Sequence, residues 1–315
     1  MAAVLDATYL PFTADQLRAH FAPVTGTGDP DRHLAYYLAS VRQAQAYADQ
    51  VRQGMTPTPA QARLGRQMEK DERFWVAAAL MGLYHQDGGA TRSKRFGQLL
   101  NRAGLQPPGS YASWPDALSG RLELFFEVSL PSPPSYRHWL RDHLDERMPI
   151  PHLKTLAHGA GGRLEGATKA DAMLLAPGTG VAVIFEAKVL SDISTHVTFD
   201  LARNQIARLI DVMLDANPRL RDPLSHREPA RTCLVLLTPA LLHPGTAGNA
   251  AASRLYGWLM PAYQADSPLL HQHLPHRDRH DLAEVTTRLG WASWEDCAAI
   301  LPAACPWLTT THRGT

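Results

Sequence analysis

The chain has 315 residues, 45% of them hydrophobic, which is enough to bury one large core or two small ones. A net charge of +1 at pH 7 excludes a strongly basic nucleic-acid coat protein, so any contact with nucleic acid must use a local patch. Three cysteines without a C-x-x-C spacing indicate neither a disulfide framework nor a cysteine zinc cluster. Because no basic leader and no apolar run of about 18 residues occurs, we expect a cytoplasmic protein without membrane contact.

The first third of the chain has the periodicity of helices. Apolar residues recur at helical spacing through residues 31–102, interrupted by the breaker run GMTPTP at 54–59. Three prolines at 131–134 then oppose any continuous regular element. We therefore predict a mainly helical N-terminal subdomain over residues 1–134.

The middle of the chain changes period. A helix is predicted over residues 136–147, strands within 161–190, an amphipathic helix over 199–216 and a buried strand at 232–239. The order of a helix, three strands, a helix and a strand predicts an α/β core with a mixed β-sheet over residues 135–240. A helical C-terminal extension, residues 241–315, is expected to follow.

A hairpin within residues 161–190 brings two acidic residues together. If Gly178 and Thr179 are the central turn residues, paired positions sum to 357, and Asp171 and Glu186 are such a pair. Their Cβ atoms would lie about 5 Å apart, where like charges destabilise a sheet. A divalent cation between the two carboxylates would remove that penalty.

Lys188 projects from the same strand face as Glu186 because it follows two residues later. Otherwise residues 181–190 are apolar on both faces, which is typical of a central strand. Charges placed there need each other, a metal or water. Asp171 and Glu186 are candidate ligands for Mg²⁺ or Mn²⁺, and Lys188, one of only five lysines among 31 basic residues, could stabilise negative charge in a transition state. The alternative is a structural Glu–Lys ion pair.

The pattern Asp171-x14-Glu186-Ala187-Lys188, followed by a helix, resembles the PD-(D/E)xK nuclease superfamily, whose members share an αβββαβ core. The resemblance covers roughly residues 136–240. It implies metal-dependent cleavage of DNA, or less often RNA, with Asp171 and Glu186 as metal ligands and Lys188 as the catalytic lysine. Ala170 replaces the proline of the motif. Gln205 lacks the tyrosine four residues later that a related exonuclease branch carries, and it stays a candidate site residue.

A further acidic residue often completes such a site. Glu165 is the favoured candidate because it shares strand parity with Asp171 and belongs to the same strand-like segment. The alternatives are Asp142, Asp145 and Glu146 on the preceding helix.

Two groups of basic residues are candidates for contacting nucleic acid. Arg203 and Arg208 lie on the helix after the motif, where they could face a phosphate backbone. Arg92, Lys94 and Arg95 form a basic stretch without acidic residues. For both groups, the alternative is a solvated helix face.

Histidines suggest two further sites, each with a simpler alternative. His271, His273, His276 and His280 could bind zinc, but arginines and a proline interleave them, and we favour a polar loop. His196 could carry protons near the metal or could be an ordinary loop histidine.

These patterns predict a metal-dependent nuclease acting on DNA or, alternatively, RNA. A role in genome defence or repair is implied by the resemblance alone. The sequence has no G-x-x-x-x-G-K-[ST] motif, so a separate ATPase or defence-system partner is compatible with it, as is an oligomer. The rival hypothesis is a non-catalytic nucleic-acid-binding or assembly subunit that retains the nuclease fold. A third is an enzyme acting on a smaller phosphodiester.

Overall fold

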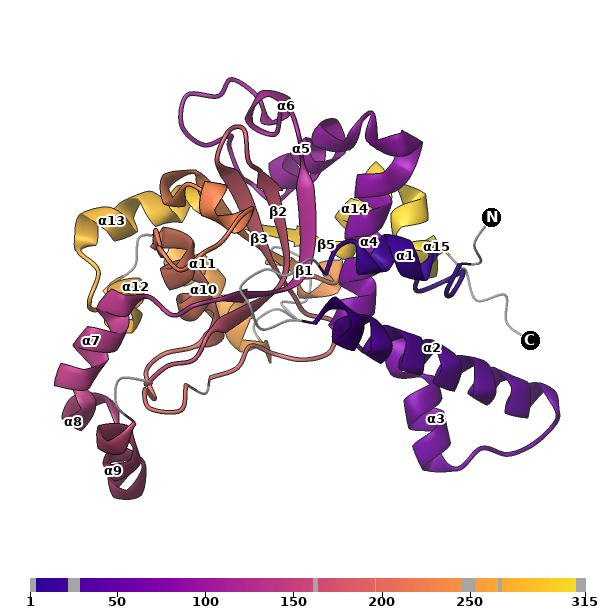
Figure 1. The fold of residues 1–315 in the computed structure, drawn as a ribbon, viewed down its shortest axis with the longest axis horizontal. Helices are drawn as coiled ribbons and strands as arrows, with labels where there is room; N and C mark the ends of the chain where they lie inside the picture. Colours follow the sequence, from indigo (N-terminus) through magenta and orange to yellow (C-terminus); the bar gives the residue numbers. More distant parts are fainter. Residues whose placement is uncertain are drawn as a thin grey trace.

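A five-stranded sheet runs through the middle of the molecule (Figure 1). The computed structural model describes residues 4–21, 29–160, 164–195, 197–244, 253–265 and 268–309. The sheet order follows the chain, with β1 to β3 antiparallel and β4 and β5 parallel to β3. The strands are β1 (Glu123–Leu130), β2 (Thr168–Ala176), β3 (Val181–Ala187), β4 (Thr232–Thr238) and β5 (Leu289–Ser293). The prediction of an α/β fold with a mixed sheet is confirmed.

The β2–β3 hairpin has the predicted register. Its pairs run from Ala176 with Val181 to Ala172 with Phe185, and the residue numbers of each pair sum to 357. The connection is a four-residue loop, residues 177–180, in place of a two-residue turn, and Gly180 takes a φ of +72° that few other residues adopt. A four-residue loop centred on the same two positions leaves the register unchanged.

Helices cover both faces of the sheet. One face packs against α4 (Glu72–His85), α5 (Arg92–Arg102) and α14 (Trp294–Ile300), and the other against α10 (Gln205–Leu214) and α11 (Leu255–Gln264). Helix α10 begins six residues after the predicted start at residue 199, because the Asn204 side chain accepts a hydrogen bond from Ala207 N and caps the helix there. The sheet therefore lies in a buried middle layer.

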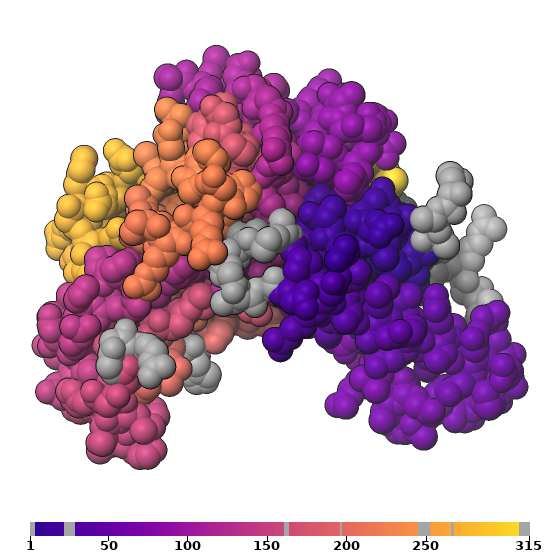
Figure 2. All heavy atoms as spheres, viewed as in Figure 1, coloured from indigo at the N-terminus to yellow at the C-terminus, as the bar shows by residue number. Residues whose placement is uncertain are grey.

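Two helical arms extend from this core. One is formed by α2 (Pro30–Arg52) and α3 (Pro59–Gly65), and the other by α7 (Pro134–Asp142), α8 (Leu144–Arg147) and α9 (Pro151–Gly159). Figure 2 shows the molecule hollowed between the two arms. The other α-helices in the described residues are α1 (Ala14–Arg18), α6 (Trp114–Ala117), α12 (Pro268–His273), α13 (Arg279–Ala283) and α15 (Pro306–Thr309).

The sheet extends beyond both boundaries expected from the sequence. Strand β1 lies before residue 134 and β5 after residue 240, so both flanking regions contribute a strand. The prolines at 131–134 end β1 rather than excluding a strand, since a proline is compatible with the position after a strand. The expectation of a helix before the first core strand is corrected for residues 136–147, because α7 and α8 follow β1. In the described residues, no helix combines the length and apolar character needed to cross a membrane.

Candidate metal centre at the ends of the central strands

Three charged side chains meet where β3 ends. Glu186 is the next-to-last residue of β3, and Lys188 follows the strand directly. Only 1% of Glu186 and 7% of Lys188 is exposed, and Lys188 Nζ donates a hydrogen bond to Glu186 Oε1 at 2.7 Å. The backbone of Lys188 is fixed to β4, since its N–H donates to Leu237 O at 2.8 Å. In Figure 1 the β2–β3 loop is at the top of the sheet, and β3 ends on the lower side, between the two arms.

Asp171 adjoins this pair from β2. The β2–β3 ladder stops at Ala172 and Phe185, and one position further on Asp171 Oδ2 accepts a hydrogen bond from Ala187 N at 2.7 Å. Burial and the neighbouring Glu186 raise the pKa of Asp171 well above its ordinary value, although Lys188 and the Ala187 N–H oppose the shift. The two carboxylates therefore interact as the register predicted.

The charges on the other two groups are also perturbed. Burial raises the pKa of Glu186, with Lys188 opposing the change. Burial alone would lower the pKa of Lys188, but Glu186 and Asp171 raise it, so the lysine is held as an ammonium. The two carboxylates, Asp171 and Glu186, thus share one positive charge, the ammonium group of Lys188.

The oxygens of Glu186 differ in a way that suits a metal. Oε1 accepts hydrogen bonds from Lys188 and, at 2.6 Å, from Gln205 Nε2. Oε2 is buried and has no hydrogen-bond partner among the described residues, a costly arrangement for a carboxylate. A hard cation would satisfy it. No group of three or more His, Cys, Asp or Glu side chains in the described ranges is placed to bind a metal, so the fit is to two carboxylates with water, which Mg²⁺ commonly accepts.

Gln205 links this site to the next helix. Its Oε1 accepts a hydrogen bond from Ser194 N at 3.2 Å while its Nε2 holds Glu186. As the first residue of α10, it is positioned by the Asn204 cap. The structure thus brings Gln205 to Glu186.

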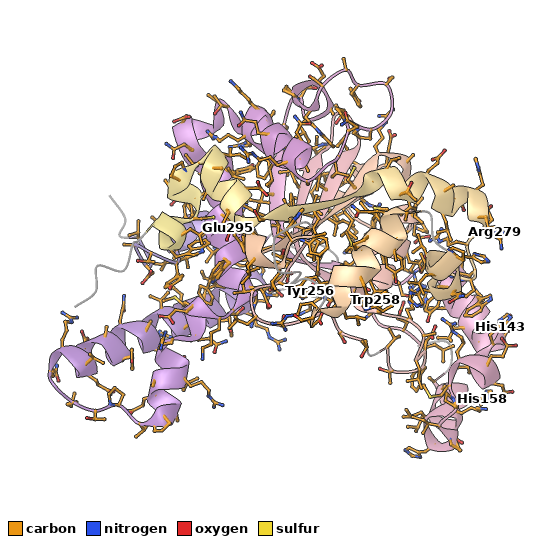
Figure 3. The ribbon with its side chains drawn as sticks, turned by 180° about the vertical axis from the view of Figure 1, so that it is seen from behind. His143, His158, Tyr256, Trp258, Arg279 and Glu295 are labelled. Carbon is orange, nitrogen blue, oxygen red and sulfur yellow. The ribbon has the colours of Figure 1, made fainter. Side chains whose placement is uncertain are left out.

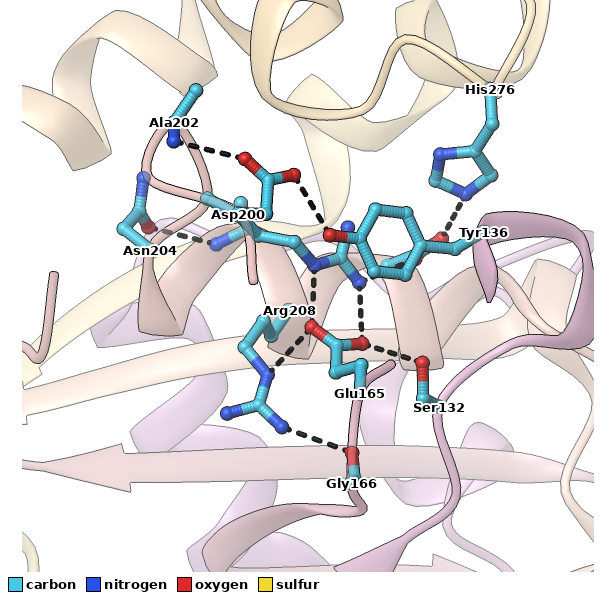
Figure 4. A network of polar contacts seen from close by, with 12 residues as sticks. Ser132, Tyr136, Glu165, Gly166, Asp200, Ala202, Asn204, Arg208 and His276 are labelled. Atoms are coloured by element: carbon cyan, nitrogen blue, oxygen red, sulfur yellow. Dashed lines mark hydrogen bonds and ion pairs between the residues drawn. The ribbon is translucent and has the colours of Figure 1, made fainter. Parts of the chain in front are cut away.

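Glu165 lies in a different cluster. It precedes β2, which begins only at Thr168, so the strand parity used to favour it does not apply. Its oxygens accept hydrogen bonds from Arg203 and Ser132 and pair with Arg208 at 3.1 Å (Figure 4). The structure does not bring it together with Asp171 and Glu186. The alternative acids Asp142, Asp145 and Glu146 lie on the α7–α9 arm.

Two carboxylates near the site were not expected from the sequence. Glu127 of β1 lies opposite Asp171, since the flanking pairs are Phe126 with Ala172 and Val128 with Ala170. It has a φ of +53°, an uncommon conformation for a non-glycine residue, and it adds to the upward pKa shifts of Asp171 and Glu186. Recognising β1 as a strand would have been needed to find it.

Glu72, the second of these, is the first residue of α4. It accepts hydrogen bonds from Ser191 Oγ and, at 3.4 Å, from Val189 N, so it holds the segment that follows Lys188. Its charge also contributes to the raised pKa values of Glu186 and Lys188. No local sequence pattern places a residue 116 positions earlier beside Lys188.

The predicted nucleic-acid-binding arginines are less accessible than expected. Arg203 is 1% exposed, with its guanidinium bonded to Glu165 and Asp211, and Arg95 is 6% exposed and bonded to the carbonyls of Leu83 and Gln86. Neither is placed to contact a ligand without rearrangement. The other three differ from these. Arg92 stacks on Tyr84 at 3.5 Å, Lys94 is exposed, and Arg208 is partly exposed.

Two of the histidines considered as zinc ligands have separate protein partners. His273 contacts Tyr263 and, at 3.2 Å, Asn204, whereas His276 Nε2 lies 2.9 Å from Asp211 Oδ1. Part of the expected polar loop is helical, because α12 extends to His273. His196 lies outside the described residues.

No family model matches this chain, and no match was found among curated proteins or solved structures.

Proposed function

We propose that this protein is a metal-dependent nuclease that hydrolyses phosphodiester bonds, with DNA as the preferred substrate and RNA as the alternative. One observation carries the proposal: Asp171 and Glu186 on adjacent strands share a single lysine, and one buried Glu186 oxygen has no partner in the described structure. An excess of buried negative charge favours a bound cation.

The residues divide the chemistry among them. Asp171 and Glu186 would hold Mg²⁺ or Mn²⁺, which supplies phosphate polarisation and a water of lowered pKa when bound. The Lys188 ammonium stabilises negative charge that develops on the phosphate. Gln205 is a positioning residue, because its hydrogen bond keeps Glu186 Oε1 in place and leaves Oε2 for the cation.

The topology supports the proposed relationship to PD-(D/E)xK nucleases. Three antiparallel strands, a helix and a parallel strand follow in the order β1, β2, β3, α10 and β4, as in the strand order that the resemblance implies. The hollow between the arms (Figure 2) suits a polymeric substrate. By analogy with that superfamily alone, we extend the proposal to a role in genome defence or repair.

A second candidate function has one observation in its favour. Lys188 and Glu186 contact each other at 2.7 Å, as the members of a structural ion pair would. A non-catalytic nucleic-acid-binding or assembly subunit would keep this pair for stability. It would bind nucleic acid equally well without a divalent cation.

Cleavage of labelled substrates separates the two functions. Single- and double-stranded DNA and RNA, and a cyclic dinucleotide for the small-phosphodiester alternative, are incubated with Mg²⁺, Mn²⁺ or EDTA. We expect cleavage by the wild type that is lost in EDTA and falls by about 100-fold or more in Asp171→Asn and Lys188→Ala. Asp145→Asn, which changes an exposed carboxylate on α8, is the matched control and should cleave normally. Equal activity of wild type and Asp171→Asn, or no cleavage of any substrate, would reject the nuclease.

A further inference from the structure

A small pocket adjoins the candidate metal centre. It has a volume of about 320 Å³ and is formed by the start of β2 and the first turn of α10. That is about ten times the roughly 30 Å³ that one water molecule occupies in the liquid. Its lining residues are Ala167, Thr168, Lys169, Ser194, Gln205 and Arg208.

The lining carries positive charge and no carboxylate. Lys169 is exposed, and Arg208 is partly exposed. The only acid paired with Arg208 in the described residues is Glu165, which also pairs with Arg203 at 2.8 Å. Asp211, the second acid of Arg203, pairs with Arg277 as well, so these two carboxylates do not neutralise all three arginines. The pocket is therefore suited to an anion.

Arg208 is also held in a fixed orientation. Its Nη2 donates to the carbonyl oxygens of Gly166 at 3.1 Å and Ala167 at 3.3 Å, and its Nε pairs with Glu165 (Figure 4). A guanidinium that is already ordered loses little entropy when it binds a ligand. Lys169 adds a flexible ammonium with three donors.

Gln205 forms a wall shared by the pocket and the metal centre. Its side chain lines the pocket and donates to Glu186 Oε1 at 2.6 Å. Lys169 lines the pocket from β2. It precedes Asp171 on that strand by two residues, which is about 7 Å. An anion in the pocket would thus lie next to the two carboxylates.

We propose that this pocket binds a phosphate group of the substrate strand adjacent to the bond that is cleaved, through Lys169 and Arg208. Naming the substrate strand rests on the proposed nuclease function, whereas anion binding by the pocket does not. The phosphate is either an internal phosphodiester or a 5′-terminal phosphate. Both present the oxygens that arginine and lysine recognise.

Binding of short fluorescent single-stranded DNA in EDTA tests the pocket without cleavage. We expect Lys169→Gln to weaken binding about tenfold, the size of one charge-assisted hydrogen bond, and to lower the salt dependence of binding by about one phosphate contact. The matched control is Arg279→Gln, which removes the same charge from an exposed residue of α13 (Figure 3) and should bind as the wild type does. Unchanged binding by Lys169→Gln, or an equal loss in Arg279→Gln, would overturn the proposal.

Two further measurements make the binding result specific. Arg208→Lys keeps the charge but loses the fixed guanidinium, and it should also weaken binding, with thermal unfolding confirming that it folds. Comparing oligonucleotides with and without a 5′-phosphate assigns the source: a loss confined to the phosphorylated strand identifies a terminal phosphate, and a loss with both strands an internal one.

The outcomes also separate the pocket from the nuclease. If the wild type cleaves nothing but Lys169→Gln still loses binding, the proposed function fails and the pocket stands. If the wild type cleaves and Lys169→Gln neither binds more weakly nor has a raised KM, the pocket fails and the nuclease stands.

Discussion

Two clusters of charged side chains contact α10, one through Asp211 and the other through Gln205, and they differ in charge balance. In the first, Arg203 is bonded to Glu165 at 2.8 Å and to Asp211 at 2.7 Å, and Arg277 and His276 also contact Asp211. In the second, Asp171 and Glu186 share Lys188. The first cluster has a basic partner for each acid, whereas the second has an excess of negative charge.

The pKa shifts of the two aspartates have opposite signs. Burial opposes ionisation of both. At Asp211 the hydrogen bond from His276 and the charge of Arg203 outweigh burial and lower its pKa well below the ordinary value. At Asp171, burial and Glu186 outweigh Lys188 and raise the pKa. The comparison teaches that a balanced cluster contributes to holding the fold together, while an unbalanced one marks the place where a ligand's charge is missing.

Breaking the balanced cluster should have the largest effect on stability. Arg203→Met leaves Glu165 and Asp211 buried without their shared partner, so we expect a loss of about 3 to 5 kcal/mol in the free energy of unfolding. Urea denaturation measures it. Arg141→Met, at an exposed position on α7, should change stability by less than about 0.5 kcal/mol. A loss below about 1 kcal/mol for Arg203→Met would show that the cluster is not needed for the fold.

Removing a charge from the unbalanced cluster should raise the free energy of unfolding rather than lower it. In EDTA at pH 7, we expect Asp171→Asn to stabilise the fold by about 1 kcal/mol, because one of two repelling carboxylates is lost. If Asp171→Asn instead destabilised the fold by about 1 kcal/mol, the claim that this cluster has an excess of negative charge would be contradicted.

The pH dependence sharpens this second prediction. Because the folded-state pKa of Asp171 is raised, the folded protein binds more protons than the unfolded chain above the ordinary value of about 3.9, and stability falls as the pH rises through that window. The gain in stability of Asp171→Asn over the wild type should therefore be greatest near neutral pH and vanish near pH 4. Asp211 has a lowered pKa, so its effect on stability has the opposite pH dependence. Its contribution to the stability of the fold is full above about pH 3.9 and is lost as the pH falls through its folded-state pKa.

The hairpin could be predicted from the sequence because its information is local. The register of Asp171 and Glu186 follows from the turn position and an alternating pattern, and both lie within 16 residues of each other. Partners from distant segments could not be predicted in this way. Arg203 has the same appearance in the sequence as an exposed arginine until Glu165 and Asp211 are seen to enclose it.

Strand β1 illustrates a different failure. The prolines that follow it suggested an irregular segment, although a proline disrupts a ladder only where its N–H would be needed. Missing this strand also meant missing Glu127, whose position opposite Asp171 exists only once β1 and β2 are paired.

The smallest expected effect is at Glu127. Glu127→Gln removes a half-buried charge that adds to the repulsion around Asp171, and Arg73 at 3.9 Å partly offsets that charge. We expect a gain of about 0.5 kcal/mol in EDTA, measured by urea denaturation. In the Asp171→Asn background the gain should shrink, since the repelling partner is already neutral. An undiminished gain would place Glu127 outside the unbalanced cluster.

Mn²⁺ binding followed by electron paramagnetic resonance tests the central claim most directly. The wild type should bind Mn²⁺, and Glu186→Gln and Asp171→Asn should weaken binding by more than about tenfold, since changing residues that only hydrogen-bond to metal ligands already costs about 10- to 100-fold. Glu146→Gln, an exposed glutamate on α8, should bind as the wild type does. Equal Mn²⁺ affinity in wild type and Glu186→Gln would contradict a metal centre at the end of β3.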